Sequence, residues 1–235
     1  MIYNLLTYKS SHLDWCEDNF IFSKHIAEFY NTISNLPYIF LSILGILAFQ
    51  QMNTHNTDKI MYGSLCVIGI TSFYFHMTLS LLGQLLDEFS IIFLLINGLI
   101  LCIKDQFKKK LLISYLVTHS WIMLWYPCIN IPILFFLGVT LWRVMRYKFK
   151  KYKDNSFKMY WRRAQLFFGG SIICWVGDRF FCELTSPYYL HAWWHVFSAF
   201  TGYYAILVGV FLEYNNEDHY ITQNHILPIV NKINL

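Results

Sequence analysis

The chain of 235 residues is poor in charge, because Asp, Glu, Lys and Arg together make up only 14% of it. An ordinary soluble domain contains about 25% of these residues. This shortage of charge excludes a typical water-soluble protein. Apolar residues make up 56% of the chain. The charges gather in clusters separated by long neutral stretches, and a membrane-spanning helix needs roughly 20 mostly apolar residues. The composition therefore predicts an all-α membrane protein.

The sequence also lacks linkers, repeats and low-complexity tracts, so we expect a single domain over residues 1–235. The start of the chain has no apolar core and carries Asp14, Glu17 and Asp18, which argues against a cleavable signal peptide. The net charge is only +4, and loop topology explains it. Nucleic acid is therefore not an expected partner.

Seven apolar runs predict a seven-transmembrane helix bundle. We expect a tight polar hairpin at Gly83-Gln84 between the second and third runs, and a boundary near Pro127 between the fourth and fifth. The runs cover residues 26–49, 60–82, 86–103, 111–126, 129–147, 163–181 and 189–212.

Basic residues predict the orientation of this bundle. One cluster follows the third run and another surrounds the connection between the fifth and sixth, so seven spans put both on one side, which the positive-inside rule makes cytosolic. Residues 1–25 then form an outer or lumenal acidic segment, and residues 214–235 form a cytosolic tail. The clusters are Lys104, Lys108, Lys109 and Lys110, and Arg143, Arg146, Lys148, Lys150, Lys151, Lys153, Lys158, Arg162 and Arg163.

Three histidines lie within the apolar runs, where an imidazole is costly unless it serves a function. His191 and His195 are four residues apart and share one helix face. The predicted orientation brings His76 to the same outer end. Three histidines with one open position are typical of catalytic zinc, whose water has a pKa lowered to about 7. The alternative is that they are packing or interfacial residues, which is our interpretation of the other six histidines.

Other polar residues are expected at the same outer end. Ser72 lies one turn before His76, where its hydroxyl can stabilise an oxyanion or simply bond a helix carbonyl. Asp87 opens the third run and suits a general base beside a metal-activated water. We interpret Glu88 as a residue that faces the lipid headgroups. Asp178-Arg179 is interpreted as an intramembrane ion pair or network.

An acidic cluster near the amino terminus offers oxygen ligands at short spacing. Asp14, Glu17 and Asn19, followed by Glu28, suit calcium, which accepts carboxylate, amide and backbone oxygens. The alternative is a solvated acidic cap that favours the dipole of the first helix.

Three motifs resemble those of the alkaline ceramidase family. The first combines Asp14-Trp15-Cys16-Glu17 and Asn19 with residues 27–35. The second covers residues 75–88, and the third is His191-Ala192-Trp193-Trp194-His195. The motifs occur in the family's order and span residues 14 to about 200.

This resemblance implies a seven-helix membrane amidase that hydrolyses ceramides to a sphingoid base and a fatty acid. It implies Ser72 and Asp87 in the catalytic centre. Related receptors of the adiponectin-receptor type also have three-histidine zinc sites, so a receptor or sensor is the first alternative, and a transporter with proton-carrying histidines is the second. The implied zinc ligands are His76, His191 and His195, and the implied calcium ligands are Asp14, Trp15 (through its carbonyl), Glu17, Asn19 and Glu28.

The resemblance also implies partners and a compartment. The expected partners are the ceramide substrate and the bilayer, and no obligate protein partner is inferred. A eukaryotic member is expected in the endoplasmic reticulum or Golgi membrane, with its active site facing the lumen or exterior. The chain departs from the family in a more basic loop between the fifth and sixth runs and in the lack of a clear dilysine-type retrieval signal.

Topology further predicts a disulfide. Cys16 and Cys182 both lie at the outer side, where an oxidising compartment permits a bridge. The other cysteines are interpreted as apolar fillers; they are Cys66, Cys102, Cys128 and Cys174.

Overall fold

The computed structural model describes residues 5–50, 52, 54–150, 155–213, 219–221 and 230–232, and these residues are mostly helical. Apart from residues 219–221 and 230–232, the expected carboxyl-terminal tail lies outside the described part of the chain. In chain order the elements are α2 (Phe29–Ile33), α3 (Leu36–Ala48), α4 (Thr57–Thr78), α5 (Leu81–Cys102), α6 (Gln106–Trp125), η1 (Pro127–Ile129), α7 (Asn130–Lys150), α8 (Asn155–Phe180), α9 (Cys182–Thr185), η2 (Ser186–Tyr188), α10 (Leu190–Glu213), β1 (His219–Ile221) and β2 (Val230–Lys232).

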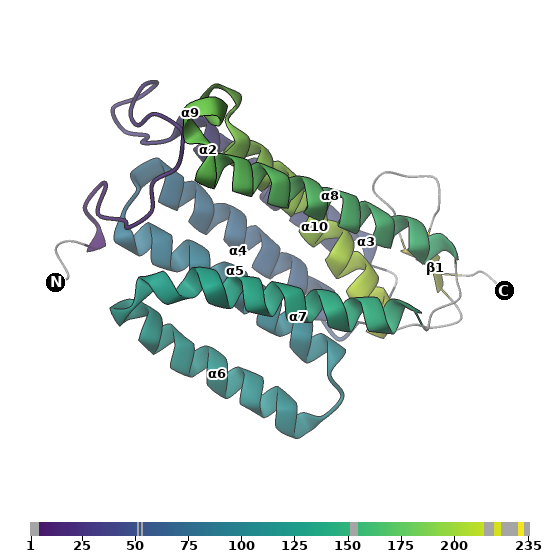
Figure 1. Ribbon diagram of the computed structural model, residues 1–235. Coiled ribbons are helices and arrows are strands. Elements are labelled where there is room, and N and C mark those ends of the chain that lie inside the picture. The colour runs from purple at the N-terminus through teal and green to yellow at the C-terminus, as the bar shows by residue number, and fades with distance from the viewer. Residues whose placement is uncertain are drawn as a thin grey trace.

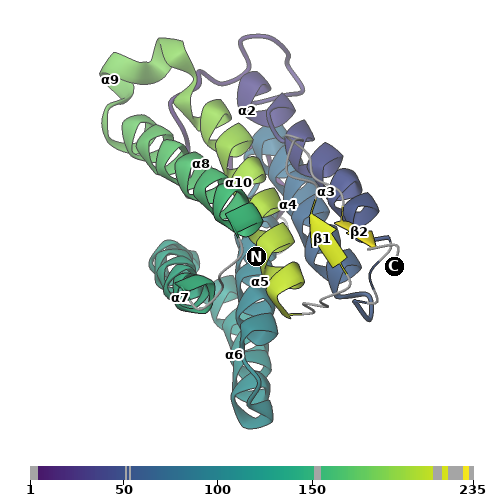
Figure 2. The same ribbon diagram turned by 90° about the vertical axis from the view of Figure 1, so that its right-hand side faces the viewer.

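The long helices lie side by side as a bundle (Figure 1). Helix α10 packs most extensively on α8, while α4 packs between α3 and α5, and α7 lies against α5. Figure 2 shows α6 and α7 set to one side of the other helices. The segment before α2 covers the end of the bundle where α9 lies, and β1 lies at the opposite end (Figure 1). Helix α10 begins at the covered end, so its first residues lie beneath the amino-terminal segment.

Five helical stretches of the described chain have the length and composition of a membrane span. The expected fourth and sixth spans correspond to α6 and α8, which have 20 and 26 residues but more charges. The helical membrane fold is confirmed at this level, whereas the remaining two spans and the orientation stay predictions. The five stretches are Phe29–Ala48, Thr57–Thr78, Leu81–Cys102, Pro127–Lys150 and Leu190–Glu213.

The turn between α4 and α5 differs from the expected hairpin at Gly83-Gln84. Helix α4 ends at Thr78, Leu79 adopts a left-handed φ of 47°, and Ser80 caps α5 by accepting a hydrogen bond from the Gly83 amide. Such a cap satisfies a backbone donor that the helix start leaves free. Gly83 is therefore inside α5. A Cβ at this position would lie 2.8 Å from Cα of Phe75, so glycine permits the close approach of α5 to the end of α4.

Small residues also allow close packing inside the bundle. A Cβ at Gly202 of α10 would lie 2.7 Å from the Leu65 side chain of α4. A Cβ at Gly45 of α3 would meet the Tyr62 ring. Membrane helices depend on van der Waals packing rather than on a hydrophobic driving force, and small residues let their backbones approach. This packing holds α3, α4 and α10 in fixed register.

The predicted disulfide joins Cys16 to Cys182, with Cα atoms 5.3 Å apart. It ties the amino-terminal segment to the first residue of α9. The other four cysteines are free thiols; Cys174 is buried as expected of an apolar filler, Cys66 and Cys102 are half-buried, and Cys128 is exposed.

Replacing Cys16 by serine is expected to lower the free energy of unfolding by about 2–4 kcal/mol, because the bridge constrains a long loop of the unfolded chain. Its cysteines are 166 positions apart. Thermal unfolding of the purified protein in detergent measures this loss. Cys128→Ser removes an exposed free thiol and is the matched control. Equal stability of the two variants would contradict the prediction.

Candidate active site

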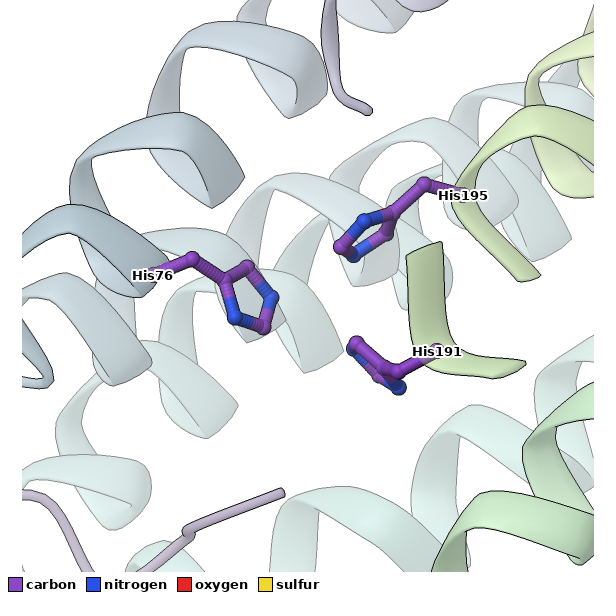
Figure 3. A group of neighbouring side chains, drawn as sticks. All are labelled: His76, His191 and His195. Carbon is purple, nitrogen blue, oxygen red and sulfur yellow. The ribbon is translucent and has the colours of Figure 1, made fainter. Parts of the chain in front are cut away.

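Three buried histidines converge at the covered end of the bundle. His76 lies in the last turn of α4, and His191 and His195 lie near the start of α10. Their exposed fractions are 1%, 2% and 0%. One ligand atom from each lies within 4.8 Å of those of the other two, and Figure 3 shows the rings approaching one another from the two helices. The structure thus brings together the predicted histidines in a group that can hold a metal ion.

Neighbouring side chains fix the orientation of two of these rings. Nδ1 of His76 lies 2.5 Å from Oε2 of Glu28, and Nδ1 of His195 lies 2.7 Å from Oγ of Ser34. A metal-binding histidine commonly uses its second ring nitrogen for such a hydrogen bond. Nε2 of His195 and Nδ1 of His191 are buried and have no hydrogen-bond partner among the described residues. Buried polar atoms are seldom left unpaired, so this donor set fits a metal ion.

Asp178 fixes the beginning of α10 beneath the amino-terminal segment. Its Oδ1 accepts the backbone N–H of His191 at 3.3 Å, and its Oδ2 accepts that of Cys16 at 3.2 Å. The guanidinium of Arg179 lies 5.8 Å from the Trp15 ring, which itself stacks on His191 at 3.7 Å. Asp178 therefore belongs to a hydrogen-bonded network, one of the two predicted alternatives, rather than to a close pair with Arg179.

Ser72 and Asp87 lie at the same end of the bundle as the histidines. Ser72 is one turn before His76 on α4, and Asp87 is in the second turn of α5. Both are buried, and the Ser72 hydroxyl is close enough to interact with the Asp87 carboxyl. Neither Oγ of Ser72 nor Oδ1 of Asp87 has a well-directed hydrogen bond within the described chain. Asp87 also lines the cavity, so its free oxygen can contact a bound molecule.

Glu88 is buried, so its interpretation as a headgroup-facing residue is wrong. Its exposed fraction is 5%. Oε1 accepts a hydrogen bond from Nε2 of Gln84 at 3.0 Å, and Oε2 accepts one from Nδ2 of Asn130. The two amide partners make burial of the carboxyl group tolerable. Glu88 thereby joins α5 to the start of α7 next to Asp87.

The acidic amino-terminal residues gather near the histidines. Oδ1 of Asp14 lies 3.1 Å from Nδ2 of Asn19, and the Asp14 carboxyl interacts with that of Glu28. The Trp15 amide donates to Oε1 of Glu28 at 3.2 Å. Oδ1 of Asn19 is buried without a partner in the described part of the chain. Glu28 therefore lies between this segment and His76.

Glu17 joins the same amino-terminal segment to the start of α2. Its two carboxyl oxygens accept the backbone N–H groups of Tyr30 at 2.7 Å and Asn31 at 2.8 Å. Burial raises the pKa of Glu17, although these hydrogen bonds oppose the shift and the nearby Glu28 carboxyl adds to it. Gathered carboxyl groups and an unpaired amide oxygen form a donor set of the kind calcium accepts.

An apolar cavity of about 350 Å³ opens from this site into the bundle. His76, Asp87 and His191 line its part at the covered end of the bundle, and Cys102, Met145 and Gly209 line the part toward the opposite end. Because α7 and α8 both contribute to its wall, the cavity extends between them. Such a space accommodates a long apolar group whose polar end meets the histidines.

Sequence reasoning missed two features of the site. Ser34 was recognised only as part of a motif, and its contact with His195 joins positions 161 residues apart. Glu28 was assigned to calcium alone, although it also contacts His76. The only signal available was that both occur in a motif rich in polar residues at the start of an apolar run.

The fold and the site define a helical membrane protein whose buried polar residues surround a three-histidine group at the mouth of an apolar cavity. The family model described as Ceramidase matches residues 7–231. The chain therefore belongs to the ceramidase family, and it is an enzyme of the amidohydrolase class.

Individual relatives agree with this assignment. The chain is 34% identical over 215 residues to the alkaline ceramidase of Drosophila melanogaster, covering 85% of this chain and 76% of the relative. It is 34% identical over 229 residues to alkaline ceramidase 1 of Mus musculus, covering 89% and 83%. The alkaline ceramidase of Arabidopsis thaliana is 29% identical over 212 residues, covering 83% and 81%.

Proposed function

We propose that this protein hydrolyses the amide bond of ceramides within the membrane and releases a sphingoid base and a free fatty acid. The observation that carries the proposal is the convergence of His76, His191 and His195 beside Asp87 at the mouth of an apolar cavity. Membership of the ceramidase family supports ceramide as the substrate.

The metal of this site is proposed to be zinc. His76, His191 and His195 would hold it, since three imidazoles with an open position are typical of catalytic zinc. When bound, zinc polarises a carbonyl oxygen and lowers the pKa of water. Glu28 and Ser34 would keep the rings of His76 and His195 turned toward it.

Two side chains would carry out the proton transfer and charge stabilisation. Oδ1 of Asp87 accepts a proton from the attacking water while the oxygen of that water bonds to the amide carbon. Asp87 then returns this proton to the leaving nitrogen as the carbon–nitrogen bond breaks, so that Asp87 ends as it began. Oγ of Ser72 donates a hydrogen bond to the carbonyl oxygen while negative charge develops there.

The cavity would hold one hydrocarbon chain of the substrate. Its apolar wall lets that chain stay out of water while the amide reaches Asp87 and the histidines. A site inside the bilayer suits this substrate, because both chains of a ceramide prefer lipid to water.

Calcium is proposed as a second, structural or regulatory ion. Its ligands would come from the gathered acidic segment, and it would brace that segment against the start of α2. The proposed ligands are Asp14, Trp15 (through its carbonyl), Glu17, Asn19 and Glu28.

We further propose seven spans, with α6 and α8 completing the five apolar ones. The basic residues around the connection between α7 and α8 support a cytosolic position for that end. The site would then face the lumen or exterior, in the endoplasmic reticulum or Golgi membrane of a eukaryotic cell. The Cys16–Cys182 disulfide supports an oxidising environment at the covered end.

Purified protein in detergent is expected to release equal amounts of sphingoid base and fatty acid from a labelled ceramide. Mass spectrometry of both products measures the reaction. A receptor of the same architecture would bind a lipid without releasing both products, so their absence under active, folded conditions would overturn the proposal.

A further inference from the structure

Two hydroxyl groups from different helices form a pair on the wall of the cavity. Oη of Tyr38 on α3 lies 2.6 Å from Oγ of Ser198 on α10, and both residues line the cavity. Ser198 is one turn after His195. His76, Asp87 and His191 line the same cavity. The pair therefore shares the cavity with the residues of the proposed reaction centre.

The hydrogen bonds within this pair leave Tyr38 able to accept one more hydrogen bond. The Ser198 hydroxyl donates to the backbone oxygen of Trp194. With its proton used there, Oγ of Ser198 accepts the O–H of Tyr38. The phenol oxygen of Tyr38 then keeps a lone pair for a further donor, since a hydroxyl can donate once and accept as well.

Other hydroxyls of the cavity wall are engaged within their own helices. Ser171 donates to the backbone oxygen of Phe168 at 2.8 Å, and Thr201 donates to that of Phe197 at 2.9 Å. Such bonds are the usual arrangement of serine and threonine in membrane helices. Tyr38 differs, because its hydroxyl pairs with a side chain of another helix on the wall of the cavity that Asp87 also lines.

We propose that Tyr38 and Ser198 form a subsite for a hydroxyl group of the substrate near the scissile amide, with Tyr38 as the residue that determines this specificity. The inference rests on the proposed function. The substrate hydroxyl donates to Oη of Tyr38 while Ser198 holds the phenol in place. Three positions near the amide can carry such a hydroxyl: the acyl carbon next to the carbonyl, and the two base carbons that flank the nitrogen-bearing carbon.

The subsite gives a modest preference rather than an absolute requirement. Without a substrate hydroxyl, Tyr38 and Ser198 still satisfy each other, so no buried group is left unpaired. One added hydrogen bond between neutral groups then corresponds to a preference of about 3- to 10-fold.

The experiment uses the full-length protein and three pairs of ceramides, each differing by one hydroxyl at one of these positions. The ratio of kcat/KM within each pair is measured for the wild type and for Tyr38→Phe, which removes a single oxygen. For one pair, the ratio is expected to fall by about 3- to 10-fold toward unity. Ser198→Ala is expected to lower the ratio for the same pair, and it serves as the second variant if Tyr38→Phe does not fold.

Tyr62→Phe is the matched control, because Tyr62 is a buried tyrosine whose hydroxyl donates to the backbone oxygen of Tyr203, and it does not line the cavity. It is expected to leave all three ratios unchanged. If Tyr38 only joins α3 to α10, Tyr38→Phe lowers stability and no ratio changes, which overturns the subsite while ceramide hydrolysis stands. If the folded wild type hydrolyses none of the ceramides, the proposed function falls and the subsite with it.

Discussion

Replacing His195 by alanine is expected to reduce ceramide hydrolysis to the background rate. The imidazole is fully buried, its Nδ1 is fixed by Ser34, and its Nε2 has no partner in the described chain. Removing it leaves two imidazoles, too few to hold a catalytic zinc ion firmly. Metal analysis of purified protein is expected to show about one zinc per chain in the wild type and little in the variant.

His119→Ala is the control for this variant, because His119 is also buried but lies on α6 outside the three-histidine group. It is expected to retain its zinc and its activity. Full turnover by folded His195→Ala protein would exclude a catalytic role for the three-histidine group. Loss of zinc from both variants would instead indicate a general failure of folding.

Replacing Asp87 by asparagine is expected to lower kcat by about 10²- to 10⁴-fold, because the amide cannot accept and return a proton. The change preserves the size of a side chain that is only 8% exposed. Zinc content is expected to remain near the wild-type value, since the proposed zinc ligands are the three histidines and Asp87 is not among them. This combination separates loss of proton transfer from loss of the metal.

Asp58→Asn is the matched control for Asp87→Asn. Asp58 is a buried carboxyl in the first turn of α4, remote from the histidine at the other end of that helix. Its partner is the Thr54 hydroxyl, which can also donate to an amide oxygen. We expect nearly normal turnover. An Asp87→Asn variant with normal kcat would remove Asp87 from the proposed proton transfer.

The histidine group could be predicted from sequence because each step depended on strong signals. The spacing of His191 and His195 fixes their relative position on a helix, and the basic clusters indicate which end of each apolar run is outer. His76 then falls at the same end without knowledge of any distance. The roles proposed for Ser72 and Asp87 followed from their expected places at this end and from the motifs around them.

Glu88 and Tyr38 could not be interpreted in this way. Glu88 follows Asp87 at an expected membrane boundary, and its burial depends on Asn130, 42 residues away. Tyr38 is one aromatic residue among many in an apolar run, and its partner Ser198 is 160 residues away. Local patterns carry no information about such pairs, because helix packing decides them.

The turn before α5 shows a local limit of prediction. Gly83 and Gln84 suggested a hairpin by their residue types, yet the Ser80 cap begins the helix before them. Gly83 is needed instead for close contact with Phe75. A glycine required by packing and a glycine required by a turn look alike in sequence.

The distribution of the site along the chain affects how the protein matures in the cell. During synthesis, Glu28, His76 and Asp87 are added to the chain well before His191 and His195 of the last long helix. Until that helix is inserted, the Asp178 carboxyl lacks the backbone N–H of His191 that it accepts in the folded protein, and a carboxyl without its partner is costly in lipid. The disulfide of Cys16 likewise cannot form until Cys182 has been added to the chain. A chain that stops before α10 therefore lacks two of the three grouped histidines, so we expect it to have no complete metal-binding group.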